Sequence, residues 1–357
     1  MFSLFFTHYY FITAYHYSNL LVYLLLFYLA LQILGQKKLE TVNYILLILL
    51  VALIIQTGWG LFEFAKGDNV RVNGSFFNSS YYAGYLIALI SFPLAEISFG
   101  KERERRSIFS NVGMVLVFVC AFSALLASRS RAIIFVIIPF GLIVLARWKW
   151  KGLVSVFIII LALFIIPNPF LQRLKTLHKD PYAWERITIW KTSLNMIRHH
   201  PLGVGLGMYQ YYYLRYTYPM KGIKIGRYSK KATRAHNEIL HYSAEASPVF
   251  SICSIIFLGL ILVPLTKKIL KEPKKDPQYK KKLSFLASSW AIIFHSLVDS
   301  NLHQPPIAIV FIINLACLIY LFSEDFNLLK NTQLEIKSKN FVKWFVLVSS
   351  FIIALLM

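Results

Sequence analysis

The sequence is poor in cysteine and in acidic residues. Its three cysteines, Cys120, Cys253 and Cys317, each stand inside an apolar run, far from one another. Neither a disulfide framework nor a cysteine-based zinc site is indicated, because both need paired or clustered thiols. The 16 acidic residues are outnumbered by 38 Lys and Arg, which gives a formal net charge of +22. Such an excess suits contact with anionic lipid or phosphate.

Charged residues of either sign are scarce, at 15% of the chain against 57% hydrophobic residues. Apolar runs long enough to span a bilayer as helices recur along the whole chain. We therefore predict an all-α fold, a polytopic transmembrane helical bundle, because these runs are too long for barrel strands. Residues 2–16 are a candidate for an eleventh span. The ten other spans are predicted near 18–35, 42–60, 80–99, 108–127, 132–147, 153–167, 247–265, 283–300, 305–322 and 342–357.

The spans divide the chain into three parts. N-terminal transmembrane helices are expected in 1–167, a large external loop in 168–246, and C-terminal transmembrane helices in 247–357. Lysine and arginine concentrate in alternate short loops, such as 101–106 and 266–282. By the positive-inside rule those loops are cytoplasmic, so the large loop is expected on the periplasmic or extracellular side of a plasma (inner) membrane.

The large loop is basic, with thirteen Lys or Arg and four Asp or Glu, a net charge of +9. Residues 184–199 have the spacing of an amphipathic helix, whose apolar face we expect to carry Ile187, Trp190, Leu194 and Ile197. Glycines then alternate along 202–209, which predicts a tight turn with backbone N–H groups facing an anion. Composition leaves two interpretations open: a solvated cap on the membrane surface, or an active-site loop for an anionic, sugar-bearing substrate.

Five short motifs follow one another along the chain. They are VNGSFFNSSYYAGYL (72–86), ASRSRAIIF (127–135), RITIWKTSLNMIRHHPLGVGLGMY (186–209), AHNEILHYSAE (235–245) and HSLVDSNLHQPPIA (295–308). Their order and their placement between spans resemble the O-antigen ligase and O-antigen polymerase superfamily of bacterial membrane glycosyltransferases. The resemblance covers about residues 50–322.

The resemblance implies an enzyme that moves a glycan from an undecaprenyl-pyrophosphate carrier to an acceptor hydroxyl, in lipopolysaccharide or surface polysaccharide assembly at the cell envelope. It implies no cofactor and no metal. The expected partners are the lipid-linked glycan, an acceptor (lipid A core, repeat unit or protein) and membrane lipids, but not nucleic acid. Ligase, polymerase and protein O-oligosaccharyltransferase activities all remain open. A transporter or flippase of lipid-linked sugars and a non-catalytic scaffold are the alternatives.

The resemblance also selects the catalytic candidates. His236 is the expected general base, because it matches the motif histidine and an imidazole titrates near neutral pH. Asn237 would orient the base or the sugar. Arg129 is the first candidate for binding pyrophosphate and Arg131 the second; both stand on a short hairpin between two spans. Arg186 in the large loop is the third, since arginine offers a bidentate fork. Snorkelling to lipid headgroups is the competing interpretation of the hairpin arginines.

Three further residues are secondary candidates. His241 lies five residues after His236, so the two would not share a helical face. His295 and Asp299 are four residues apart within a predicted span, where ionisable side chains are costly and usually face a cavity or each other. A structural His–Asp pair and a catalytic one are both compatible with that spacing.

Overall fold

The computed structural model describes most of the chain. The described residues are 9–67, 71–99, 108–148, 181–217, 232–272 and 276–323, with the single residues 154, 157, 161 and 165. Every regular element in these residues is a helix, which confirms the predicted all-α class. Five of the helices are long and apolar enough to cross a membrane, and this supports a multi-pass membrane protein.

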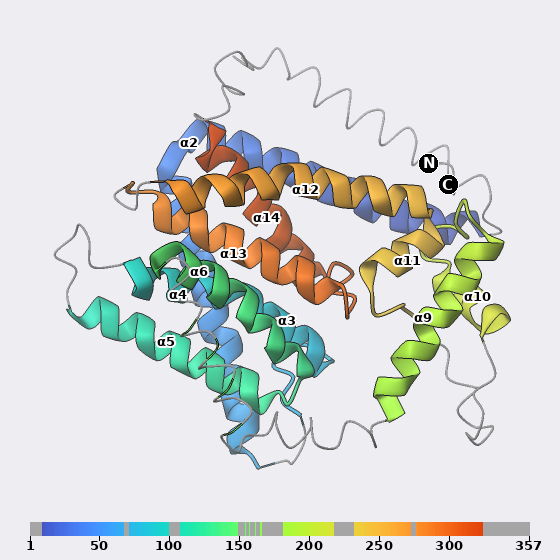
Figure 1. Ribbon diagram of the computed structural model, residues 1–357, viewed down its shortest axis with the longest axis horizontal. Coiled ribbons are helices and arrows are strands. Elements are labelled where there is room, and N and C mark those ends of the chain that lie inside the picture. The colour runs from blue at the N-terminus through green and yellow to red at the C-terminus, as the bar shows by residue number, and fades with distance from the viewer. Residues whose placement is uncertain are drawn as a thin grey trace.

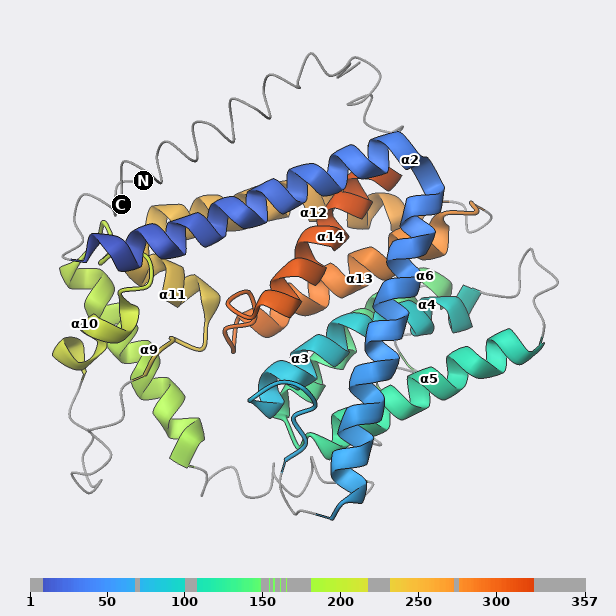
Figure 2. The ribbon, with the colours of Figure 1, turned by 180° about the vertical axis from the view of Figure 1, so that it is seen from behind.

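Helix α2, Tyr10–Ala65, forms the first two predicted spans. Its two apolar halves are Tyr10–Gln36 and Leu39–Ala65, and the helix bends sharply between them (Figure 2). A separate span at 2–16 is wrong, because residues 10–16 already belong to the first half; residues 2–8 lie outside the described residues.

The next three predicted spans are each helical. The first is interrupted at Ile90, where α3 (Ser79–Leu89) gives way to α4 (Ser91–Phe99). The second is α5, Ile108–Ala127. The third begins as a 3-10 helix, η1 (Arg131–Val136), and continues as α6 (Ile137–Trp148). The predicted span 153–167 lies outside the described residues, apart from four single positions.

The C-terminal part contains α12 (Pro248–Lys271), α13 (Tyr279–Ser296) and α14 (Pro305–Leu321). Helix α13 ends earlier than the predicted span 283–300, so Asp299 does not stand within a helix. It lies in the connection between α13 and α14 instead. The predicted span 342–357 is outside the described residues.

Helix α3 is buried along almost its whole length, against α13, α14 and η1. Small residues permit close approach between membrane helices. A Cβ atom at Gly84 would lie 2.6 Å from Nδ1 of His295 and 2.9 Å from Oδ1 of Asn301. Gly84 therefore lets α3 pack directly against the polar end of α13.

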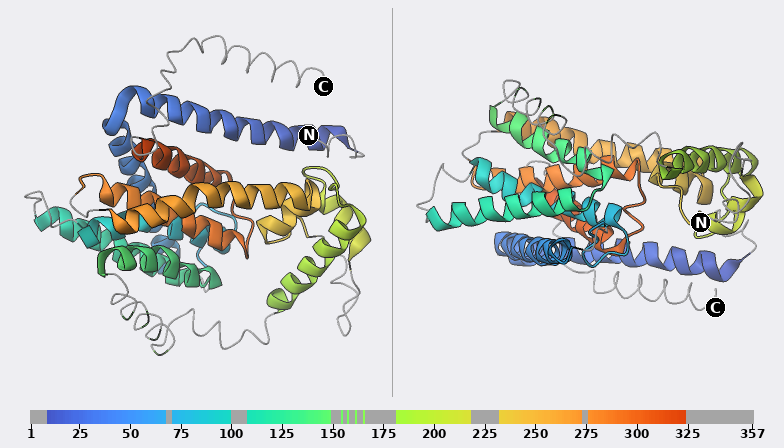
Figure 3. Two further views of the ribbon diagram at one scale, coloured as in Figure 1. Left: turned by 45° about the horizontal axis from the view of Figure 1, so that its top comes forward. Right: turned by 90° about the horizontal axis from the view of Figure 1, so that it is seen from below.

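The helices of the large loop gather at one end of the molecule (Figures 1 and 3). They are α9 (Pro181–His199), α10 (Tyr209–Tyr216) and α11 (Glu238–Glu245). Together they bury a small core of their own, which includes Met196, Met208 and Tyr209. This core is separate from the main transmembrane core.

Helix α9 confirms the helix predicted over 184–199, but only half of its predicted apolar face is packed, since Trp190 and Ile197 lie against the loop core. Ile187 and Leu194 are 41% and 46% exposed, whereas Ile189 and Met196 are buried. Ser193 lies on the buried side, because its hydroxyl bonds the Ile189 carbonyl and the Tyr209 hydroxyl, at 2.8 and 2.7 Å. A fully bonded serine is tolerated in a core, and apolar spacing alone does not reveal it.

Candidate functional site

A cavity of about 840 Å³ lies where the loop helices approach the ends of the transmembrane helices. Its walls come from the start of the α3 region, the hairpin before η1, helix α9, the segment before α11 and the end of α13. The ionisable side chains that line it are Arg71, Arg131, Glu185, Arg186, His236 and His295. Three arginines and two histidines against one glutamate make it a cavity suited to an anion.

Asp299 joins two of these lining residues. Its Oδ1 lies 2.9 Å from Nδ1 of His236, and its Oδ2 lies 3.3 Å from a guanidinium nitrogen of Arg186. The other guanidinium nitrogen of Arg186 donates to the Val298 carbonyl at 2.8 Å. Asp299 is almost fully buried, while His236 is partly exposed toward the cavity. Residues separated by more than sixty positions therefore form one hydrogen-bonded group.

The carboxylate is charged in this group. Burial alone would raise the pKa of Asp299, but the hydrogen bond from His236 and the nearby Arg186 guanidinium hold that pKa below its usual range. The Ser300 backbone N–H adds a further hydrogen bond to Oδ1, at 2.9 Å. Because an ionised carboxylate only accepts, Nδ1 of His236 carries a proton, and in the neutral ring the lone pair is on Nε2.

The backbone of His236 is in the left-handed region, with φ of 49°. That conformation costs about 1 kcal/mol or more for a residue with a side chain, and it often marks a functional site. Asn237 holds the turn in place. Its side-chain oxygen accepts from Leu240 N at 3.0 Å as the N-cap of α11, and its Nδ2 donates to the Leu297 carbonyl at 2.8 Å. Both ends of this amide are thus used to position the backbone beside Asp299.

The two arginines of the short hairpin differ in position. Arg131, the first residue of η1, lines the cavity, whereas Arg129 is not among the lining residues. Arg129 itself has a φ of 49°. Ser128 and Ser130 fix the hairpin: Ser130 N donates to the Ser128 hydroxyl, and Ala132 N donates to the Ser130 hydroxyl, both at 3.2 Å.

His295 is buried at the cavity wall beside Phe135, with ring centroids 5.3 Å apart. The described residues supply no hydrogen bond to its Nδ1. Asp299 pairs with His236 and Arg186, so the side-chain pair considered from the four-residue spacing is not formed. The link between the two positions is a backbone bond, from Asp299 N to the His295 carbonyl at 3.1 Å.

His241 belongs to a second polar group, outside the cavity. It lies 3.4 Å from the Glu245 carboxylate, and the ring of His303 packs edge-on to it at 4.3 Å between centroids. None of these three residues lines the cavity. Burial lowers the pKa of His241. Burial would also raise the pKa of Glu245, but contact with His241 and hydrogen bonds from the backbone lower it to about 2.

The glycine-spaced turn wraps around Glu245. Tyr209 N donates to its carboxylate at 3.0 Å, and Gly205 N donates to its backbone carbonyl at 2.9 Å. Gly203 has a φ of +86°, and a Cβ there would lie 2.3 Å from the Glu245 backbone oxygen. The turn and the anion expected from the sequence are both present, but the anion is the protein's own glutamate.

Two of the ionisable lining residues, Arg71 and Glu185, are not among the candidates predicted from the sequence. Each stands immediately beside a motif, Arg71 before 72–86 and Glu185 before 186–209. Both residues therefore lie one position outside the motifs that carry the resemblance. A basic residue next to a motif that enters a span was the signal available for Arg71.

Residues 116–246 match the family model described as O-antigen ligase. The matched stretch includes the hairpin arginines, α9 and the His236 turn, but not Asp299. No curated protein matches the chain. The family match, which covers 131 of the 357 residues, confirms the resemblance of this chain to the O-antigen ligase superfamily and supports a membrane protein of glycosyl-transferring type.

Proposed function

We propose that the protein transfers a glycan from an undecaprenyl-pyrophosphate carrier to an acceptor hydroxyl, with His236 as the general base. The observation that carries this proposal is the grouping of His236, Arg131 and Arg186 around one cavity, with Asp299 joining His236 to Arg186. Such a grouping supplies both requirements of the reaction, a proton acceptor and cations for the leaving group.

The base acts through Nε2. Asp299 accepts a hydrogen bond from Nδ1–H, so the lone pair of the neutral ring is on Nε2, and we place the acceptor hydroxyl beside it. As the acceptor oxygen bonds to the anomeric carbon, its proton passes to Nε2. The bond from that carbon to the carrier's pyrophosphate oxygen breaks, and this oxygen keeps the electron pair. Asp299 stabilises the imidazolium that forms, since it is already ionised.

The cations act on the leaving group. Arg71 and Arg131 approach the cavity from the transmembrane side, and Arg186 approaches from α9. The pyrophosphate diester gains negative charge as its bond to the sugar breaks and leaves as the lipid monoester, so fixed cations stabilise the transition state more than the ground state. Val298 and Asp299 already orient the Arg186 side chain, so it needs little rearrangement when the leaving group gains charge.

The acceptor defines three versions of this proposal: a lipid A core sugar, another repeat unit, or a protein hydroxyl. We favour ligase or polymerase activity, because the family match is to an O-antigen ligase model. The large loop would then lie on the periplasmic or extracellular side of the inner membrane, where lipid-linked glycans are consumed. A transporter or flippase would instead need ionisable residues along a path through the membrane, whereas the ionisable residues of this cavity gather at one end of the bundle.

Complementation tests the proposal in cells. A strain that lacks its own copy would receive wild type, His236→Ala or Arg186→Ala at matched membrane expression, and its surface glycans would be separated on a gel. We expect wild type alone to restore the pattern. His199→Ala is the matched control, because His199 is exposed at the end of α9 and away from the cavity. Polymer that accumulates unattached in the mutants indicates a ligase, and single repeat units indicate a polymerase. A full pattern from both cavity variants would contradict the enzyme proposal.

A further inference from the structure

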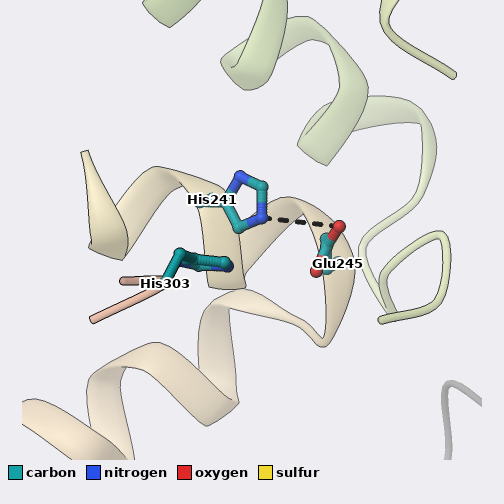
Figure 4. A group of neighbouring side chains, drawn as sticks. All are labelled: His241, Glu245 and His303. Carbon is teal, nitrogen blue, oxygen red and sulfur yellow. Dashed lines mark ion pairs between the residues drawn. The ribbon is translucent and has the colours of Figure 1, made fainter. Parts of the chain in front are cut away.

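Outside the cavity, the densest group of metal-ligating side chains in the described residues is formed by His241, Glu245 and His303. One nitrogen or carboxylate oxygen from each lies within 4.8 Å of the others. His241 and Glu245 are one helical turn apart on α11, and His303 comes from the connection that precedes α14 (Figure 4). The three side chains converge on one point from two segments that are distant in sequence.

The spacing within the group suits metal ligands better than a simple hydrogen bond. His241 Nε2 and Glu245 Oε1 are 3.4 Å apart. A hydrogen bond with a charged partner is usually about 2.7–2.9 Å long. Two ligands bound to one zinc ion at about 2.0–2.1 Å in tetrahedral geometry are about 3.3 Å apart. The ligand atoms of all three residues lie within 4.8 Å of one another, so His303 must approach the other two to complete the set.

The surroundings of the group also fit a metal. His303 Nδ1 lies 2.8 Å from the carboxylate of Glu238, which itself accepts from Leu302 N at 2.7 Å. A carboxylate behind one ring nitrogen directs the other nitrogen to a metal. The rings of Tyr209 and Tyr242 pack on His241 and His303, at 4.8 and 5.0 Å between centroids, and they shield the point of convergence from solvent.

We propose that His241, Glu245 and His303 bind a single zinc-class transition-metal ion. Two imidazoles and one carboxylate favour such an ion over Mg²⁺ or Ca²⁺, which prefer oxygen ligands alone. Three protein ligands leave a fourth position for water. None of the three residues lines the cavity, so the ion acts by holding segments together. It ties α11, which begins just after His236, to the connection that carries Asp299.

One contact must change when the metal binds. Ala235 N–H now points at His241 Nδ1, at 3.3 Å. A metal on Nε2 leaves the ring proton on Nδ1, so this contact breaks and Ala235 shifts. Because Ala235 is next to His236, metal binding and the conformation of the His236 turn are expected to be coupled.

Metal analysis of the full-length protein tests the proposal, independently of any transfer activity. The protein would be purified in detergent through a histidine-free tag, without chelator, and its metals measured by mass spectrometry. We expect about one zinc ion per chain in the wild type. His303→Ala and Glu245→Gln should fall to background, whereas His199→Ala should retain the ion.

A second measurement covers variants that fail to fold. Wild-type protein stripped with a chelator would be titrated with Co²⁺, which gives visible d–d bands in a tetrahedral site with nitrogen ligands. The bands and a metal-dependent rise in melting temperature are expected. Wild-type protein without bound metal and without Co²⁺ bands would overturn the proposal, and the group would then be a hydrogen-bonded cluster only. Zinc that persists in His303→Ala would also overturn this ligand assignment.

Discussion

Replacing Asp299 by Asn tests whether this buried carboxylate orients the base. The carboxylate accepts from His236 and Ser300 through Oδ1 and from Arg186 through Oδ2. An amide offers one oxygen and one NH₂ group, so it cannot serve both sides. With the oxygen toward His236, the NH₂ group faces the Arg186 donors. With the amide flipped, the NH₂ group donates to Nδ1 and moves the ring proton to Nε2, where the lone pair is needed.

Both orientations lower activity. A base in the wrong tautomer, or without its partner, is expected to lower kcat by about 10²–10⁴-fold. The free energy of unfolding of the Asp299→Asn variant falls as well, since removing one partner of a buried ion pair costs about 3–5 kcal/mol. The assay is glycan transfer by purified protein in detergent, with kcat and donor KM measured separately. We expect the loss to fall mainly on kcat.

A matched control separates chemistry from folding. Glu96 pairs with Lys280 at 3.0 Å, at the opposite end of α13 from Asp299, and both side chains are about one-fifth exposed. Glu96→Gln removes a carboxylate of an ion pair without touching the cavity, so its kcat should stay near that of wild type. The positioning role would be refuted if folded Asp299→Asn protein transferred glycan within about threefold of the wild-type rate.

The remaining predictions concern the cavity wall, the glycine turn and pH. Arg131→Ala should raise the donor KM by about 10- to 100-fold, as expected for a lost hydrogen bond to a charged group, and Arg129→Ala should raise it less, because only Arg131 lines the cavity. Equal effects in a donor-binding titration would contradict that ranking. Gly203→Ala should destabilise the protein by about 2 kcal/mol or more, because φ is +86° and the added Cβ meets backbone; an unchanged melting temperature would contradict it. Asp299 has a pKa lowered in the folded state, so its stabilising contribution is fully present above about pH 3.9 and is lost as pH falls toward the folded-state value. Melting temperatures of wild type and Asp299→Asn should therefore differ by a constant amount from pH 5 to 8 and converge only in acid, and convergence near neutral pH would contradict the ionised state.

Long apolar runs made most of the fold predictable. The span at 108–127 coincides with α5, and the span at 305–322 coincides with α14 to within one residue. The ends of amphipathic helices are harder to predict from the sequence. The predicted span begins too late because the first turn of α13 contains Lys280, Lys281 and Lys282. Lys280 pairs with Glu96, and Lys282 pairs with Glu272 and Asp276. Charge cancelled by tertiary contacts is not visible in a hydropathy pattern.

The residues of the candidate site can be predicted from the sequence, but the hydrogen bonds between them cannot. Motif order singled out His236, Arg186 and Asp299, yet their hydrogen bonds join positions 63 and 113 residues apart. The nearer pairing, Asp299 with His295, was suggested by helical spacing and fails because α13 ends at Ser296. Arg129 is the first pyrophosphate candidate from the sequence and Arg131 the second, and the structure reverses this order. The hairpin geometry directs only the second to the cavity wall.

The most direct test of the central claim is single-turnover glycan transfer by purified protein, using an undecaprenyl-pyrophosphate-linked glycan and a hydroxyl acceptor. We predict transfer by wild type, a fall of about 10²–10⁴-fold in His236→Ala with donor binding retained, and no fall in His199→Ala. No transfer by wild-type protein to any of the three acceptor classes, or transfer by His236→Ala at the wild-type rate, would contradict the proposed function.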